Sequence, residues 1–126
     1  MLCDGGSRGN PGPAAAAAVL LAPDGTVLDR RAAAIGRATA GEAEYRAILL
    51  GLELAALHDT DPIELCSDSQ LAIEAVRRKG PADAGLAALV DEIHAASRRF
   101  SAVSWHWHPA RENELADALV RALLWH

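Results

Sequence analysis

The chain has few aromatic residues, two cysteines and no long apolar segment. It contains three Trp, one Tyr and one Phe, so we expect a core packed from small aliphatic side chains, with alanine foremost. Cys3 and Cys66 form no disulfide framework and lack a metal-ligand spacing, so both are expected as reduced core residues. The apolar run 14–21 is too short to span a membrane, and no basic leader precedes an apolar segment. The sequence therefore predicts a cytoplasmic protein without a membrane segment.

Basic residues are also in the minority, since 12 Lys and Arg face 17 Asp and Glu, for a net charge of −5. Taken alone, this charge argues against a nucleic-acid binder, because phosphate contacts come from Lys and Arg. Acids that surround a metal ion, however, lower the net charge without repelling a polyanion once the metal is bound. Composition therefore leaves the binding partner open.

Hydrophobic periodicity predicts an α/β fold within one domain, residues 1–126. A short first strand ends at Asp4 in a glycine-rich turn, and four further strands are expected at 14–21, 26–35, 63–67 and 101–107. Helices are expected at 41–58, 70–78, 84–99 and from 113 to 124. The order βββαβααβα predicts a five-stranded mixed sheet flanked by helices, because strands joined through helices lie parallel.

Four carboxylates stand where this fold would bring them together. Asp4 ends the first strand, and Asp68 follows the strand 63–67. Glu44 and Asp117 lie in the first turns of two helices, on the stripes that face the core. The helix dipole favours an acid in a first turn but does not explain why that acid faces inward, where desolvation is costly. Because oxygen ligands suit Mg²⁺ or Mn²⁺ better than zinc, the sequence predicts a divalent-metal site.

Helix capping is an alternative role for several of these polar residues. Asp68 or Ser69 can cap the helix 70–78, and for Asp68 this is a strong alternative when it is taken alone. Thr39 and Asn113 precede two other helices and are predicted caps in the same way. Capping does not account for two inward-facing acids together with two strand-end aspartates, so the metal site remains the favoured interpretation.

Other motifs carry less weight. The glycines spaced as Gly6-x-x-Gly9-x-x-Gly12 match neither a dinucleotide-binding turn nor a P-loop, and a strand rather than a helix follows them. The basic segment 77–79 is expected first as a helix end, and as a phosphate contact only second. His106 and His108 alternate along a strand, and without a third nitrogen or sulfur ligand we expect an exposed pair rather than a zinc site.

Four motifs, in order and at suitable spacings, resemble the type 1 ribonuclease H family across essentially the whole chain. They are Asp4–Pro13, Ala43-Glu44-Tyr45, Ser67-Asp68-Ser69-Gln70 and Asn113-Glu114-Leu115-Ala116-Asp117. The resemblance implies a ribonuclease H-like fold and an endonuclease that hydrolyses the RNA strand of RNA–DNA hybrids, leaving 5′-phosphate and 3′-hydroxyl ends. It also implies two Mg²⁺ per site, with Mn²⁺ as a substitute. No obligate protein partner is evident, and we expect a monomer.

The resemblance also implies roles for individual residues. Asp4 would bridge both metals, Glu44 and Asp68 would hold the metal near the leaving group, and Asp117 would hold the metal that activates water. The residues that would contact the hybrid are Gly5, Gly6, Asn10, Gln70 and either His108 or Arg111, the last two as replacements for a loop histidine of the family.

Two of the departures from the family pattern concern contacts with the substrate. Thr39-Ala40-Gly41 stands where many relatives have Thr-Asn-Asn, and a basic protrusion is missing because 77–79 runs almost directly into Gly80-Pro81. We therefore expect weaker substrate binding with an intact metal site. Two alternatives stay open. One is a non-catalytic hybrid- or RNA-binding module, which loss of one acid would indicate. The other is a nuclease of this fold that acts on DNA ends or junctions.

Overall fold

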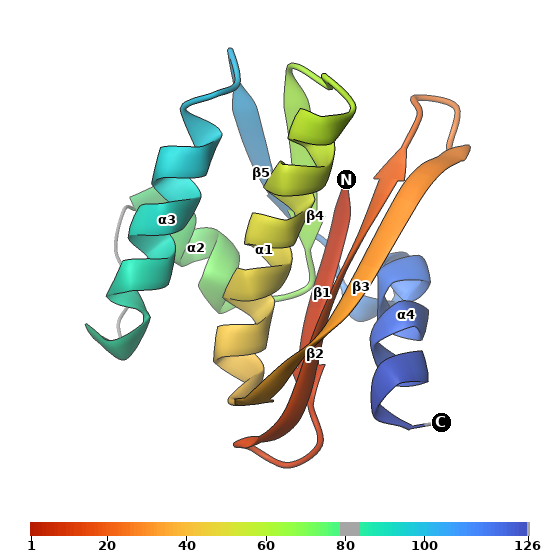
Figure 1. Cartoon of the computed structure of the whole chain (residues 1–126). Coiled ribbons are helices and arrows are strands. Elements are labelled where there is room, and N and C mark those ends of the chain that lie inside the picture. Colours follow the sequence, from red (N-terminus) through yellow and green to blue (C-terminus); the bar gives the residue numbers. More distant parts are fainter. Residues whose placement is uncertain (79–83, 126) are drawn as a thin grey trace.

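The computed structural model describes residues 1–78 and 84–125 and confirms the predicted order of strands and helices. The five strands form one mixed sheet in the order β3-β2-β1-β4-β5 (Figure 1). The strands are β1 Leu2–Ser7, β2 Gly12–Leu21, β3 Val27–Ala38, β4 Ile63–Ser67 and β5 Val103–Trp107. The helices are α1 Ala40–Leu57, α2 Gln70–Arg78, α3 Ala87–Ser97 and α4 Glu114–Leu124, with single 3₁₀ turns η1 Ala84–Leu86 and η2 Ala110–Glu112. β1 pairs antiparallel with β2 and parallel with β4.

Strand β2 explains why so much alanine is needed, because helices cover both of its faces. Ala16 and Ala18 belong to the main core with α1, whereas the alternating Ala15 and Ala17 pack with Val120 of α4. Successive side chains of a strand point to opposite faces, and small ones let helices approach from both sides. The sheet is therefore a middle layer, with α1 on one side and α4 on the other (Figure 1).

Two of the predicted helix caps are confirmed and one is wrong. The Thr39 hydroxyl accepts a hydrogen bond from the Glu42 amide, and the Ser69 hydroxyl accepts one from the Ala72 amide, so Asp68 is not needed as a cap. Asn113 precedes α4 but makes no capping bond with its side chain. That amide group is engaged elsewhere, in a contact with β1.

Element boundaries differ from the prediction mainly at β1, β3 and α3. β1 does not end at Asp4 but continues to Ser7, because its pairing with β2 extends from Leu2 to Ser7. β3 extends to Ala38 because its pairing with β2 continues through a bulge as far as Gly12. The helix expected at 84–99 begins with the 3₁₀ turn η1 and ends at Ser97. The predicted end of the preceding helix at Lys79-Gly80-Pro81 lies outside the described residues. Among the described helices, none has both the length and the apolar character needed to cross a bilayer.

Candidate active site

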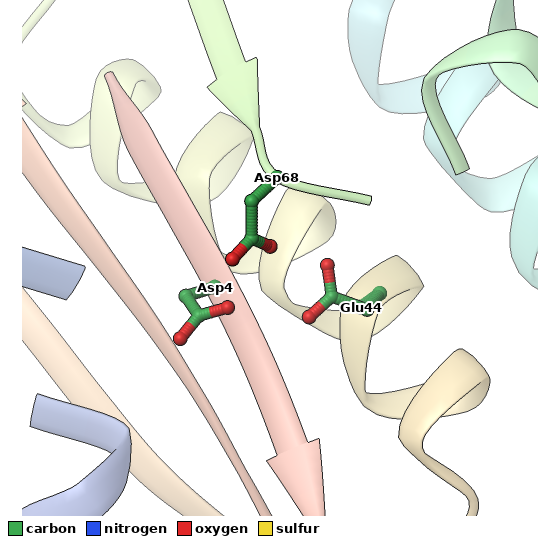
Figure 2. Close-up of side chains that lie close together, drawn as sticks. All are labelled: Asp4, Glu44 and Asp68. Carbon is green, nitrogen blue, oxygen red and sulfur yellow. The ribbon is translucent and has the colours of Figure 1, made fainter. Parts of the chain in front are cut away.

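Three carboxylates from three separate segments meet at one end of the sheet. Asp4 lies on β1, Glu44 in the first turns of α1, and Asp68 directly after β4. Each offers an oxygen within 4.8 Å of the others, and the three side chains point toward one another (Figure 2). Among the residues that the structure describes, this is the one group of three or more acids, histidines or cysteines with metal-ligand spacing.

The parallel pairing of β1 with β4 places two of these acids side by side. Cys3 pairs with Ser67, so the residues that follow them, Asp4 and Asp68, emerge at neighbouring positions. From the end of β5, the indole Nε1 of Trp107 donates a hydrogen bond to the Asp68 carbonyl at 3.2 Å. The end of β4 is thereby fixed on both sides, which holds the Asp68 backbone in place.

The third acid depends on a close contact between α1 and β1 that only glycine permits. A Cβ on Gly5 would lie 2.2 Å from the Ala43 carbonyl oxygen, so a larger residue would push the helix away. In the observed packing the Gly5 amide donates to Glu44 Oε1 at 2.9 Å. Gly5 therefore brings the first turns of α1 close to β1 and orients the Glu44 carboxylate.

Burial and mutual repulsion make the cluster electrostatically unfavourable without a cation. Asp4 is only 5% exposed, and burial, followed by the charges of Glu44 and Asp68, raises its pKa to about 9. Burial and the Asp68 charge raise the pKa of Glu44 to about 8, although the Gly5 amide and the Ser67 hydroxyl offset part of this. A divalent cation would neutralise these charges, and carboxylate oxygens are the ligands that Mg²⁺ and Mn²⁺ prefer.

Asp117, the fourth predicted acid, stands at the margin of the cluster. It lies in the first turn of α4, and its charge contributes to the raised pKa of Asp4. Its side chain is 43% exposed, and Oδ2 lies 3.4 Å from Nε of Arg121, one helical turn further on. The structure thus brings three of the four acids together and leaves Asp117 nearby, paired with an arginine.

Asn113 has a positioning role that the sequence did not reveal. Its side chain is buried, and Nδ2 donates to the Cys3 carbonyl at 2.8 Å, while Oδ1 has no partner among the described residues. Its own carbonyl accepts from the Asp117 amide at 3.1 Å. Asn113 therefore ties the start of α4 to β1, one residue before Asp4. Its place before a helix was the available signal, and that signal indicated a cap.

Several predicted substrate-contact residues have structural contacts of their own. A Cβ on Gly6 would meet Val120 at 3.4 Å, so this glycine lies against α4. Asn10 is exposed, and its Oδ1 accepts from the Ala40 amide at 2.9 Å, which joins the glycine-rich turn to the start of α1. Gln70 is exposed at the start of α2. Asn10 and Gln70 thus flank two of the segments that carry the acids.

The two histidines near the end of β5, His106 and His108, are less exposed than the sequence predicts. His108 donates its backbone amide to the Ser67 carbonyl at 3.0 Å, which places it next to Asp68 in the sheet. The expected exposed pair is wrong, because His106 and His108 are both half-buried and Nε2 of His106 is fully covered. His106 pairs with Cys66 across β4 and β5. Arg111 is exposed on η2.

A family model described as Reverse transcriptase-like matches residues 2–123. The crystal structure of RNase H1 from the halophilic archaeon Halobacterium salinarum superimposes with a TM-score of 0.88 at 37% identity, covering 96% of this chain and 93% of that one. The chain belongs to the ribonuclease H family. Its three clustered acids therefore lie on a ribonuclease H fold that is shared over nearly its full length.

Two further members of the ribonuclease H family are similar. The bifunctional protein Rv2228c of Mycobacterium tuberculosis is 38% identical over 122 residues, which cover 93% of this chain but 33% of that protein. The chain thus spans about a third of the length of this curated relative. LC11-RNase H1, solved in complex with an RNA/DNA hybrid, has a TM-score of 0.87 at 28% identity, covering 95% of this chain and 91% of that one.

Proposed function

We propose that this chain is a metal-dependent ribonuclease H that hydrolyses the RNA strand of RNA–DNA hybrids. The observation that carries the proposal is the cluster of Asp4, Glu44 and Asp68, whose oxygens lie within 4.8 Å of one another. Membership of the ribonuclease H family supports the reaction class. The similar LC11-RNase H1, solved with an RNA/DNA hybrid, supports the substrate.

The donor set fits hard divalent cations, since it consists of carboxylate oxygens that repel one another when no cation is bound. Asp4 would contact both metals, with Glu44 and Asp68 on the leaving-group side and Asp117 on the water side. When bound, two Mg²⁺ or Mn²⁺ ions would activate the attacking water and neutralise charge on the leaving oxygen. Asp117 has to turn away from Arg121 to take part, and exposed ion pairs of this kind are worth only about 0–1 kcal/mol.

The proposed reaction breaks the bond between phosphorus and the 3′-oxygen of the RNA, and water supplies the new oxygen. The products would carry 3′-hydroxyl and 5′-phosphate ends. The 2′-hydroxyls distinguish the RNA strand from the DNA strand. Asn10 and Gln70 are exposed beside the acid-bearing segments and would contact the hybrid, together with the backbone around Gly5 and Gly6. His108 or Arg111 would act near the water-side acid.

Cleavage of an end-labelled hybrid in Mg²⁺ or Mn²⁺, beside double-stranded RNA and double-stranded DNA, tests the proposal. We expect cutting of the hybrid's RNA strand alone, with 5′-phosphate ends that phosphatase treatment detects by a mobility shift. Asp4→Asn should lower the rate by more than about 100-fold, since even indirect partners of metal ligands are worth 10–100-fold. Asp91→Asn makes the same change of charge at an exposed position of α3 and should leave the rate unchanged.

Three other results would contradict the proposal, each in a different way. Hybrid binding without cutting, in wild-type protein supplied with either metal, would indicate a non-catalytic binding module. Cutting of double-stranded DNA in preference to the hybrid would indicate another nuclease of this fold. An Asp4→Asn variant as active as the Asp91→Asn control would place the reaction outside the carboxylate cluster.

A further inference from the structure

A hollow outside the carboxylate cluster lies between the β1–β2 turn and the C-terminal end of α4, which share one end of the molecule (Figure 1). Its volume is about 560 Å³, and its lining residues are Arg8, Gly9, Pro13 and Trp125. A second hollow of about 430 Å³ is lined by Arg121 and Trp125. Both volumes fall within the range of about 300–1,000 Å³ typical of ligand pockets.

Trp125 contributes little to the core. Its side chain is 59% exposed, whereas Val120 and Leu124 provide the buried contacts of α4 with the sheet. The indole therefore offers an uncovered aromatic surface, and two arginines, Arg8 and Arg121, share the hollows that it lines. An exposed aromatic ring that shares its hollows with arginines can bind nucleic acid, because bases stack on the ring and phosphates pair with arginine.

The position of these residues relates them to the carboxylate cluster. Asp117, Arg121 and Trp125 follow one another at four-residue intervals, which places them along one side of α4 and its end. The Trp125 amide donates to the Arg121 carbonyl at 2.8 Å, so Trp125 caps the end of α4 directly beyond Arg121. Eight residues of helix rise about 12 Å, or about three to four nucleotides at 3.4 Å per nucleotide.

The chemistry of the indole selects the kind of nucleotide. Bases inside a duplex are covered by their neighbours on both faces, so a protein ring stacks most readily on an unpaired base. The net charge of −5 also means that attraction to a polyanion has to come from local basic groups such as this arginine pair. The hollow therefore suits a single-stranded nucleotide better than another part of the duplex.

We propose that Trp125, Arg8 and Arg121 form a subsite for an unpaired nucleotide next to the hybrid, so that hybrids continuing into a single strand bind more tightly than blunt ones. The inference rests on the proposed function, because the hybrid positions the flanking strand. Trp125 would stack on the base, and the two arginines would contact its phosphates.

Dissociation constants measured in the inactive Asp4→Asn background test the subsite. The probes are a blunt hybrid and the same hybrid with about four unpaired nucleotides, a length that matches the helical stripe, added to the 5′ or 3′ end of its RNA or DNA strand. We expect at least one flanked hybrid to bind about 5- to 100-fold more tightly than the blunt one. Trp125→Ala should abolish this gain and leave the blunt constant within about twofold, whereas Trp125→Phe should retain most of the gain.

Two more variants complete the design. Arg8→Ala should reduce the salt dependence of flanked-hybrid binding, with a slope smaller by about 0.7–0.9 for a lost phosphate contact. Leu28→Ala removes another large exposed apolar side chain, 56% exposed on β3, and should change neither constant.

A gain from no flank, a gain that persists in Trp125→Ala, or an equal loss of blunt and flanked binding in that variant would overturn the subsite. These results leave the proposed function standing if wild-type protein cuts the blunt hybrid. Failure of wild-type protein to bind or cut the blunt hybrid would overturn the proposed function, and the subsite with it. Because the blunt constant is measured for every variant, it also reports whether the fold is intact.

Discussion

Asp4→Asn should make the metal-free protein more stable while it abolishes activity. Asp4 is 5% exposed, and its pKa is raised from 3.8 to about 9 by burial and by the neighbouring carboxylates. At pH 7 the unfolded chain carries an ionised Asp4, whereas the folded protein has to keep the proton or bury the charge. Asparagine has nearly the same shape and no charge, so this penalty disappears.

The magnitude follows from the difference between pH 7 and the ordinary pKa of 3.8, at 1.36 kcal/mol for each pH unit. The full penalty would be about 4 kcal/mol, and an incompletely hydrogen-bonded asparagine amide would offset about 1–3 kcal/mol of it. We therefore expect Asp4→Asn to gain about 1–3 kcal/mol, or roughly 3–10 °C in Tm. A carboxyl group with a raised pKa stabilises the fold at low pH, and this stabilisation is lost as the pH rises. The stability that Asp4→Asn gains over the wild type should therefore be absent near pH 4 and grow toward pH 9.

Thermal unfolding followed by circular dichroism in EDTA, from pH 4 to pH 9, measures this difference, with Asp91→Asn as the matched control. Adding Mg²⁺ should then raise the Tm of the wild type more than that of Asp4→Asn, because a ligand at 100 times its Kd stabilises by about 2.7 kcal/mol. A variant that is less stable than the wild type in EDTA, by an amount independent of pH, would refute the electrostatic account of the cluster.

Two further variants probe how the acids are positioned. Asn113→Ala should lower the free energy of unfolding by about 1–3 kcal/mol in urea titrations, because it leaves the buried Cys3 carbonyl without its donor; unchanged stability would show that the bond contributes nothing. Gly5→Ala should lower both stability, by about 3 kcal/mol or more, and hybrid cleavage, because its Cβ would lie 2.2 Å from the Ala43 carbonyl. Gly41→Ala, at a helical position where the Cβ would make only ordinary contacts with Thr39 and Leu86 at 3.9 and 4.0 Å, should instead be neutral or stabilising by up to about 1 kcal/mol. Equal effects of the two glycine substitutions would contradict the close approach of α1 to β1.

Hydrophobic periodicity predicts much of the fold and the three clustered acids, because the strands, the helices and the positions of these acids all depend on local sequence patterns. The inward position of Glu44 on α1 is readable from its spacing to the apolar stripe, and Asp68 is readable as the residue that follows a strand. Asp4 is readable as a strand residue, although β1 continues to Ser7 instead of ending there. The parallel pairing of β1 with β4, which brings the two aspartates together, follows from the order of strands and helices. For these residues, local chemistry and tertiary position agree.

The rest depends on contacts that the local sequence does not encode. Asn113 is a good cap by residue type, but its amide donates across 110 positions of sequence to Cys3. Asn10 likewise has its oxygen bonded to the Ala40 amide, 30 residues away. Helical spacing predicted the side of α4 that carries Asp117 but not the direction of its side chain, which pairs with Arg121. Polar side chains that can serve as cap, tether or ligand are the ones that sequence leaves undecided.

The pairing of Asp117 with Arg121 follows from the same electrostatics that define the cluster. The repulsion that raises the pKa of Asp4 and Glu44 would grow if a fourth carboxylate joined them without a cation. An exposed arginine one turn along α4 offers Asp117 a weak alternative partner at little expense. Divalent cations would reverse this balance, because they turn mutual repulsion into shared attraction. In the proposed metal site, Asp117 would therefore exchange its weak pairing with Arg121 for a metal ion.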